Sequence, residues 1–264
     1  MIEMTATIIG IDCATKANSV GLAFGELTPG GLVLRRVLTG DHAEPSIHEM
    51  LGRWIHEGTP VLLALDAPLG WPVGMGIALA GHVAGRPLTI EPNRMFRRLT
   101  DRFVKKTTGK TPLDVGADRI ARTAHSALEL LANIRKTTGH EIPLEWSPGS
   151  LSGVKAIEVY PAVALLTLGL KPTGYKKKDE SGLAARREIL DLLKQHIGLD
   201  RETERAVLAN GDLMDAVLCI QAGQDFLSGK CVEPLQGAIP IVRQEGWIWF
   251  RQPNALGKDE RGFS

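Results

Sequence analysis

The hydrophobic pattern opens with a run of mostly apolar residues, Thr7–Ile11, that ends in the carboxylate of Asp12. Because consecutive apolar residues cover both faces of a strand, we expect this strand in the middle of a sheet. Two later segments repeat the pattern, Val61–Asp66 and Val154–Tyr160, and each carries an acidic residue. The sequence therefore predicts several carboxylates near the edge of one sheet.

Between the first two of these segments, the pattern predicts a short antiparallel meander and a helix. Ser19–Phe24 and Leu32–Leu38 are typical of strands joined by turns. Apolar residues then recur at helical spacing over Ile47–Ile55. Because a strand, a crossover helix and a second strand favour parallel pairing, we expect Val61–Asp66 beside the first strand and parallel to it.

Residues 71–150 do not continue this pattern of strands and helices. They contain glycines, prolines and a basic stretch, Arg94–Lys110. A helix is expected over Asp118–Lys136, and a polar loop follows it. We interpret 71–150 as an insertion with helical content inside one domain that spans residues 1–264.

After the insertion, the pattern returns to regular elements. The Val154–Tyr160 strand precedes three expected helices, and the chain closes with a short strand and a polar tail that we expect to fray. These later segments are Ala162–Leu168, Leu183–His196, Asp212–Phe226, Trp247–Phe250 and Lys258–Arg261. The whole predicts an α/β fold with a mixed five-stranded sheet: three antiparallel strands, then parallel ones, flanked by helices.

Composition narrows the class of protein. Thirty-one Lys and Arg against 30 Asp and Glu leave a net charge of +1, so any binding of nucleic acid must depend on local charge. Three scattered cysteines fit a reducing cytoplasm. We find no signal peptide and no apolar run near the roughly 20 residues that span a bilayer. We therefore expect a soluble cytoplasmic protein without membrane contact.

Four of the acids are placed where one fold could gather them. Asp12 and Asp66 end strands that we expect to be parallel neighbours, and Asp212 and Asp215 share one face of a helix. Carboxylates at close range repel one another, and hard cations such as Mg²⁺ or Mn²⁺ remove that penalty. Two such ions roughly 4 Å apart can activate water and stabilise the leaving oxygen of a phosphodiester. We expect these four acids to be metal ligands and catalytic residues.

Other readings of the same residues stay open. Asp12 and Asp66 could form turns, and the Asp212–Asp215 pair, taken alone, fits helix capping better than catalysis. Glu158, which we also count as catalytic, needs a partner if it is buried in its strand, and that partner could be a structural Arg or Lys. We interpret Lys176–Lys178 as a solvated loop.

The basic side chains of the insertion are candidates for substrate binding. They could follow a phosphate backbone, with aromatic residues nearby for stacking on bases. The alternative is a solvated helix face whose apolar side chains point inward. The substrate-binding candidates are Arg94, Arg97, Arg98 and Arg119.

The residues of the acidic motifs resemble those of domain-of-unknown-function family 429, whose members are described as predicted nucleases of ribonuclease H-like fold. The resemblance spans roughly residues 7–251 and includes the closing Glu245–Trp249. The motifs that carry it are Gly10-Ile11-Asp12, Asp66-Ala67-Pro68-Leu69-Gly70, Glu158-Val159-Tyr160-Pro161 and Asp212-Leu213-Met214-Asp215-Ala216. It implies a ribonuclease H-like fold with Asp12, Asp66, Asp212 and Asp215 as ligands of two Mg²⁺ or Mn²⁺ ions. The order of the acids is also similar to RuvC-type resolvases, although Asp66 stands where those proteins typically have Glu.

Three functions are therefore compared. The first is a metal-dependent nuclease that hydrolyses DNA or RNA. The second is a phosphotransferase of actin-like fold, which also opens with strand, Asp and turn, but the sequence shows no second copy of the Gly-x-Asp opening. The third is a non-catalytic module that binds nucleic acid. A serine hydrolase has no support, since no Gly-x-Ser-x-Gly occurs.

Overall fold

The apolar run that opens the sequence forms the centre of a mixed sheet. A computed structural model of the chain describes residues 4–55, 58–116 and 118–253. Strand β1 (Ala6–Asp12) is buried at every position and pairs antiparallel with β2 (Gly21–Thr28). On its other side β1 pairs parallel with β4 (Val61–Asp66), as the sequence predicts. Strand β3 (Gly31–Thr39) continues the antiparallel side, and β5 (Val154–Val159) continues the parallel side.

The expected number of five strands is wrong, because two short strands extend the sheet at its edges. Strand β6 (Ile197–Gly198) pairs parallel with β3, and β7 (Ile248–Trp249) pairs parallel with β5. Within the described residues, the sheet therefore has seven strands in the order β6-β3-β2-β1-β4-β5-β7. A two-residue strand is too short for any apolar alternation to reveal, so β6 leaves no signal in the sequence.

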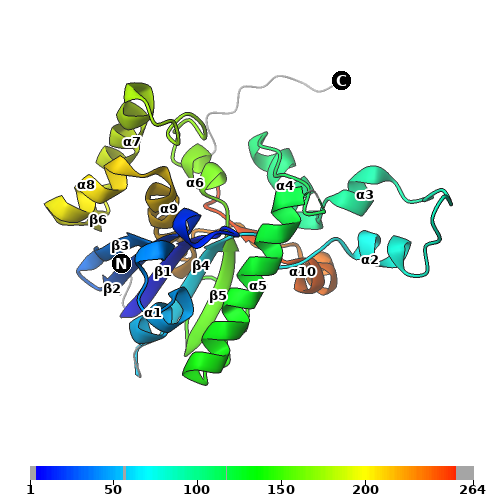
Figure 1. The fold of residues 1–264 in the computed structure, drawn as a ribbon, viewed down its shortest axis with the longest axis horizontal. Coiled ribbons are helices and arrows are strands. Elements are labelled where there is room, and N and C mark those ends of the chain that lie inside the picture. The colour runs from blue at the N-terminus through cyan, green and yellow to red at the C-terminus, as the bar shows by residue number, and fades with distance from the viewer. Residues whose placement is uncertain (1–3, 56–57, 117, 254–264) are drawn as a thin grey trace.

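Helices cover both faces of this sheet (Figure 1). Helix α9 (Gly211–Leu227) packs on β1, β2 and β4, and α1 (Ile47–Trp54) packs with α5 (Asp118–Thr138) on the opposite face. Three shorter helices share the α9 side. These are α6 (Pro161–Thr167), α7 (Glu180–Leu193) and α8 (Arg201–Ala209). The alternation of the strands divides the core: Ile8 belongs to the α9 side, and Ile9 belongs to the α1 and α5 side.

Two glycines bring α9 close enough to the sheet to place its acids. A Cβ on Gly10 would lie 2.0 Å from the carbonyl oxygen of Ala216, and one on Gly21 would lie 2.1 Å from that of Asp212. Any larger residue would push the helix away from the strands. The sequence Gly10-Ile11-Asp12 therefore sets both the end of β1 and the approach of the helix that carries Asp212 and Asp215.

In its described residues, the expected insertion contains four helices, and the last of them, α5, packs on the core of the sheet. Helices α2 and α3 extend away from the sheet (Figure 1). The remaining bounds are α2 (Val73–Leu79), α3 (Pro92–Phe96), α4 (Leu99–Thr108), α10 (Ile239–Glu245) and the 3₁₀ turns Ala17–Ser19, Gly40–His42 and Gln236–Ala238. No helix in the described part of the chain has the length and apolar character needed to cross a bilayer. The expected polar tail, Lys258–Arg261, lies outside the described residues.

Candidate metal centre

Three carboxylates from three elements meet at the end of the central strands. Asp12 and Asp66 are register partners at the ends of β1 and β4. Asp215 comes from α9, which packs on both strands. One carboxylate oxygen from each of the three residues lies within 4.8 Å of the others, with Asp12 and Asp215 buried and Asp66 half-buried. The predicted convergence is therefore observed for these three acids, and the group could hold a metal ion.

A lysine that the sequence analysis interpreted as solvated completes this group. The Nζ atom of Lys176 lies 2.5 Å from an oxygen of Asp215, 3.3 Å from Asp12 and 3.4 Å from Asp212. The side chain of Lys176 is half exposed in its loop, so the solvated-loop interpretation is correct for its exposure but misses this pairing with the acids. Asp212 contacts the lysine but, among the described residues, is not part of the close group of three.

The loop that carries this lysine is fixed from two sides. The hydroxyl of Tyr175 donates a hydrogen bond of 2.6 Å to Asp215, and its side chain is buried. Arg186, on α7, donates to the backbone carbonyls of Tyr175 and Lys177. Sequence reasoning missed the roles of Tyr175 and Lys176, because their partner Asp215 lies 40 and 39 residues further along the chain. A polar Tyr-Lys pair in a loop gives no sign of such a contact.

Burial and mutual repulsion set the charge state of the group. Burial raises the pKa of Asp12 and of Asp66 well above the usual value, and the charge of Asp215 raises both further. Burial also raises the pKa of Asp215, which Lys176 and the Tyr175 hydroxyl partly offset. For Lys176, burial works against the ammonium, but the carboxylates of Asp215 and Asp12 raise its pKa above the usual value. The ammonium therefore stays charged, and a further cation would relieve the remaining repulsion.

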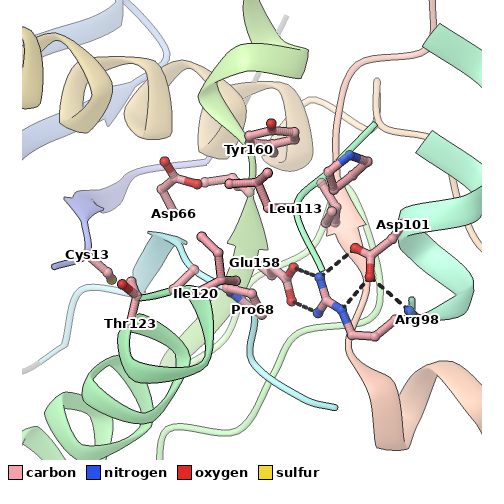
Figure 2. A pocket seen from close by; sticks show the side chains of 14 residues that line it. Cys13, Asp66, Pro68, Arg98, Asp101, Leu113, Ile120, Thr123, Glu158 and Tyr160 are labelled. Atoms are coloured by element: carbon pink, nitrogen blue, oxygen red, sulfur yellow. Dashed lines mark hydrogen bonds and ion pairs between the residues drawn. The ribbon is translucent and has the colours of Figure 1, made fainter. Parts of the chain in front are cut away.

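Glu158 lies outside this group, in a buried ion-pair network (Figure 2). Its two oxygens accept hydrogen bonds of 2.6 and 2.8 Å from Arg98 and one of 3.0 Å from the backbone N–H of Leu69. Burial raises the pKa of Glu158, and the Arg98 guanidinium acts against that rise. The position of Glu158 therefore does not support a catalytic role. Its partner is a buried arginine, Arg98, as the alternative interpretation of a structural ion pair expects.

The basic candidates divide into buried, paired and exposed side chains. Arg98 is 1% exposed, and its five N–H groups donate to Asp101, Glu158 and the carbonyl of Glu245. With no donor left, Arg98 cannot bind substrate, which corrects that expectation. Arg97 is half-buried and pairs with Asp114 at 2.8 Å. Arg94 and Arg119 are exposed and stay candidates for binding.

Comparison with known protein families gives a match over most of the chain. The model of a family described as Protein of unknown function (DUF429) matches residues 10–238. This segment contains the three clustered carboxylates, Lys176 and Tyr175. No curated protein and no solved structure matches the chain. The match confirms the resemblance to domain-of-unknown-function family 429 that the acidic motifs indicate.

Proposed function

This chain belongs to the family described as Protein of unknown function (DUF429), and from its carboxylate group we propose that it is a metal-dependent nuclease of ribonuclease H-like fold. The observation that supports this proposal most directly is the approach of Asp12, Asp66 and Asp215 to within 4.8 Å of one another. Ionised acids at this range repel one another, and the Lys176 ammonium supplies only one positive charge among them, so a bound metal ion would stabilise the group further.

The donor set fits a hard divalent cation. Carboxylate oxygens are the ligands that Mg²⁺ and Mn²⁺ prefer, and no histidine or cysteine belongs to the close group among the described residues. We propose that Asp12, Asp66 and Asp215 hold two such ions, with Asp212 as a further ligand at the more exposed side. When bound, the ions would activate water and stabilise the leaving oxygen of a phosphodiester.

The chain's own side chains orient and balance this centre. The Tyr175 hydroxyl holds one oxygen of Asp215, which fixes the rotamer of that carboxylate. The Lys176 side chain is 49% exposed, so its ammonium can move from the carboxylates to a phosphate oxygen of the substrate. Arg119 is exposed on the first turn of α5 and would add a phosphate contact. The proposed substrate is DNA or RNA.

Replacing one central ligand tests the activity. Asp12→Asn should abolish Mn²⁺-dependent cleavage of a labelled oligonucleotide while leaving the melting temperature unchanged or raised, because it relieves repulsion between buried acids. Asp191→Asn, which changes an exposed acid on α7, is the matched control and should cleave like the unmodified chain. Retained cleavage in Asp12→Asn would contradict the proposal.

One observation favours a second function, a module that binds nucleic acid without cutting it. Lys176 contacts Asp12, Asp212 and Asp215, so the described structure already provides one positive charge for these acids. A site balanced in this way could be a structural ion-pair cluster. The two functions differ in metal binding, since only the nuclease requires Mn²⁺ to bind in a way that depends on Asp12 and Asp66.

A further inference from the structure

A pocket of about 200 Å³ opens beside the carboxylate group (Figure 2). Asp66 belongs both to the group of three acids and to the wall of this pocket. The rest of the wall comes from the chain after β1 and β4, from the end of β5 and the residue after it, from β7, from the start of α4, and from α5 and the loop before it. The wall residues relevant here are Pro68, Leu113, Ile120, Thr123 and Tyr160. A ligand in the pocket would therefore lie next to any cation that Asp66 holds.

The walls suit a flat, uncharged group. Pro68, Leu113 and Ile120 supply apolar surface, and the half-buried Tyr160 adds an aromatic ring. Leu113 is 58% exposed, so its apolar side chain is accessible to a ligand in the pocket. Among the hydrogen bonds of the described residues, none uses the hydroxyl of Thr123 or of Tyr160. Both hydroxyls are therefore available to polar atoms at the edge of a ligand.

The charges around the pocket disfavour a phosphate in it. Arg98 also lines the pocket, but its guanidinium is saturated by Asp101 and Glu158. One guanidinium against these two carboxylates leaves this corner with a negative balance, and Asp66 adds another acid. Without a bound cation, this net negative balance disfavours an anion in the pocket but not an uncharged ring.

We propose that this pocket takes one unstacked nucleobase of the substrate, from a nucleotide whose phosphodiester lies at the carboxylate group. This inference rests on the proposed nuclease function, because in a nucleic acid the flat uncharged group close to a phosphodiester is the base. Stacking on the Tyr160 ring and a hydrogen bond from the hydroxyl of Thr123 would hold the base. The chain should then prefer single-stranded substrate to duplex, in which the base must first be unpaired.

Oligonucleotides that lack a single base test whether the pocket binds a nucleobase. The unmodified chain, without metal, is titrated with a fluorescein-labelled single-stranded oligonucleotide and with matched oligonucleotides that carry an abasic site at each position in turn. At one position, base loss should weaken binding at least tenfold. Thr123→Trp, which fills the pocket, should weaken binding of the intact oligonucleotide to the same extent and remove its advantage over the abasic one. Glu129→Trp, on an exposed position of α5, is the matched control.

A second variant and a metal titration separate the outcomes. If Thr123→Trp does not fold, Tyr160→Leu removes the ring and should also lose the preference for the intact base, whereas Tyr160→Phe should keep most of it. Equal binding of intact and abasic oligonucleotides at every position would overturn the inference. Mn²⁺-dependent cleavage that ignores base loss would overturn the pocket but leave the nuclease proposal standing. Binding that depends on the base, without any cleavage, would support the pocket and contradict the nuclease proposal.

Discussion

At the scale of single residues, the Lys176 ammonium lies between acids that are proposed to bind a cation, at 2.5 Å from Asp215 and 3.3 Å from Asp12. A divalent ion bound to the same oxygens must compete with this ammonium or displace it. Lys176 therefore lowers the affinity of the site for metal, and at the same time it prevents the buried acids from repelling one another when no metal is bound.

Lys176→Met should therefore bind Mn²⁺ about tenfold more tightly, a gain of about 1.4 kcal/mol, and should melt at a lower temperature than the unmodified chain when metal is absent. Calorimetric titration with Mn²⁺ measures the first effect, and thermal melting measures the second. Lys178→Met, an exposed neighbour in the same loop, serves as the control and should change neither. Weaker Mn²⁺ binding by Lys176→Met would show that the lysine supports the ion instead of competing with it.

The raised pKa of Asp12 gives a pH dependence with a defined sign. In the folded chain, burial and the charge of Asp215 keep Asp12 protonated to higher pH than in the unfolded chain, where its pKa is about 3.9. The folded state then binds more protons, so the free energy of unfolding contributed by Asp12 falls as pH rises above about 4. In metal-free melts from about pH 4 to about pH 8, Asp12→Asn should lose less stability than the unmodified chain. An identical pH dependence in both proteins would refute this account of Asp12.

At the scale of elements, Glu158 shows how a strand can carry an acid for structural reasons. It joins β5 to the start of α4 through Arg98, and to the chain after β4 through the N–H of Leu69. The same guanidinium binds Asp101, on α4, at 2.9 Å. The network thus fixes α4 and the chain after β4 against β5, beside the pocket and the carboxylate group.

Glu158→Gln should therefore destabilise the fold without abolishing metal binding. The change removes one charge of a buried ion pair, and breaking such pairs costs about 3 kcal/mol or more. Urea unfolding measures the loss, and Mn²⁺ titration at low temperature measures the affinity. Glu188→Gln, on an exposed position of α7, is the control and should change neither property. If Glu158→Gln has normal stability but no longer binds Mn²⁺, Glu158 is a metal ligand and this account of it is wrong.

The elements that sequence could predict are those whose signal is local. The apolar run of β1 and the apolar stripe of α9 are visible in the sequence itself. Once the strands β1 and β4 are placed, the positions of the acids at their ends are also predicted. The sequence analysis does not predict helix α8, because this nine-residue helix buries only Thr203 and Val207 and four of its residues are charged. Strand β6 is two residues long. Pairings across the chain, such as Lys176 with Asp215 and Arg98 with Glu158, depend on packing and give no periodic pattern.

At the scale of the whole molecule, the order of the strands brings the acids together. Because β1 and β4 are parallel neighbours, Asp12 and Asp66 end side by side at one edge of the sheet. Helix α9 then packs on both strands and supplies Asp215. The centre is thus a product of topology: no two of its acids are closer than 54 positions in sequence except Asp212 and Asp215.

The most direct test of the account is a calorimetric titration of the metal-free full chain with Mn²⁺. We predict that the unmodified chain binds two ions, that Asp66→Asn binds at least tenfold more weakly, and that the exposed control Asp191→Asn binds normally. Absence of Mn²⁺ binding to the unmodified chain, or binding that Asp66→Asn leaves unchanged, would contradict the central claim that these carboxylates form a metal centre.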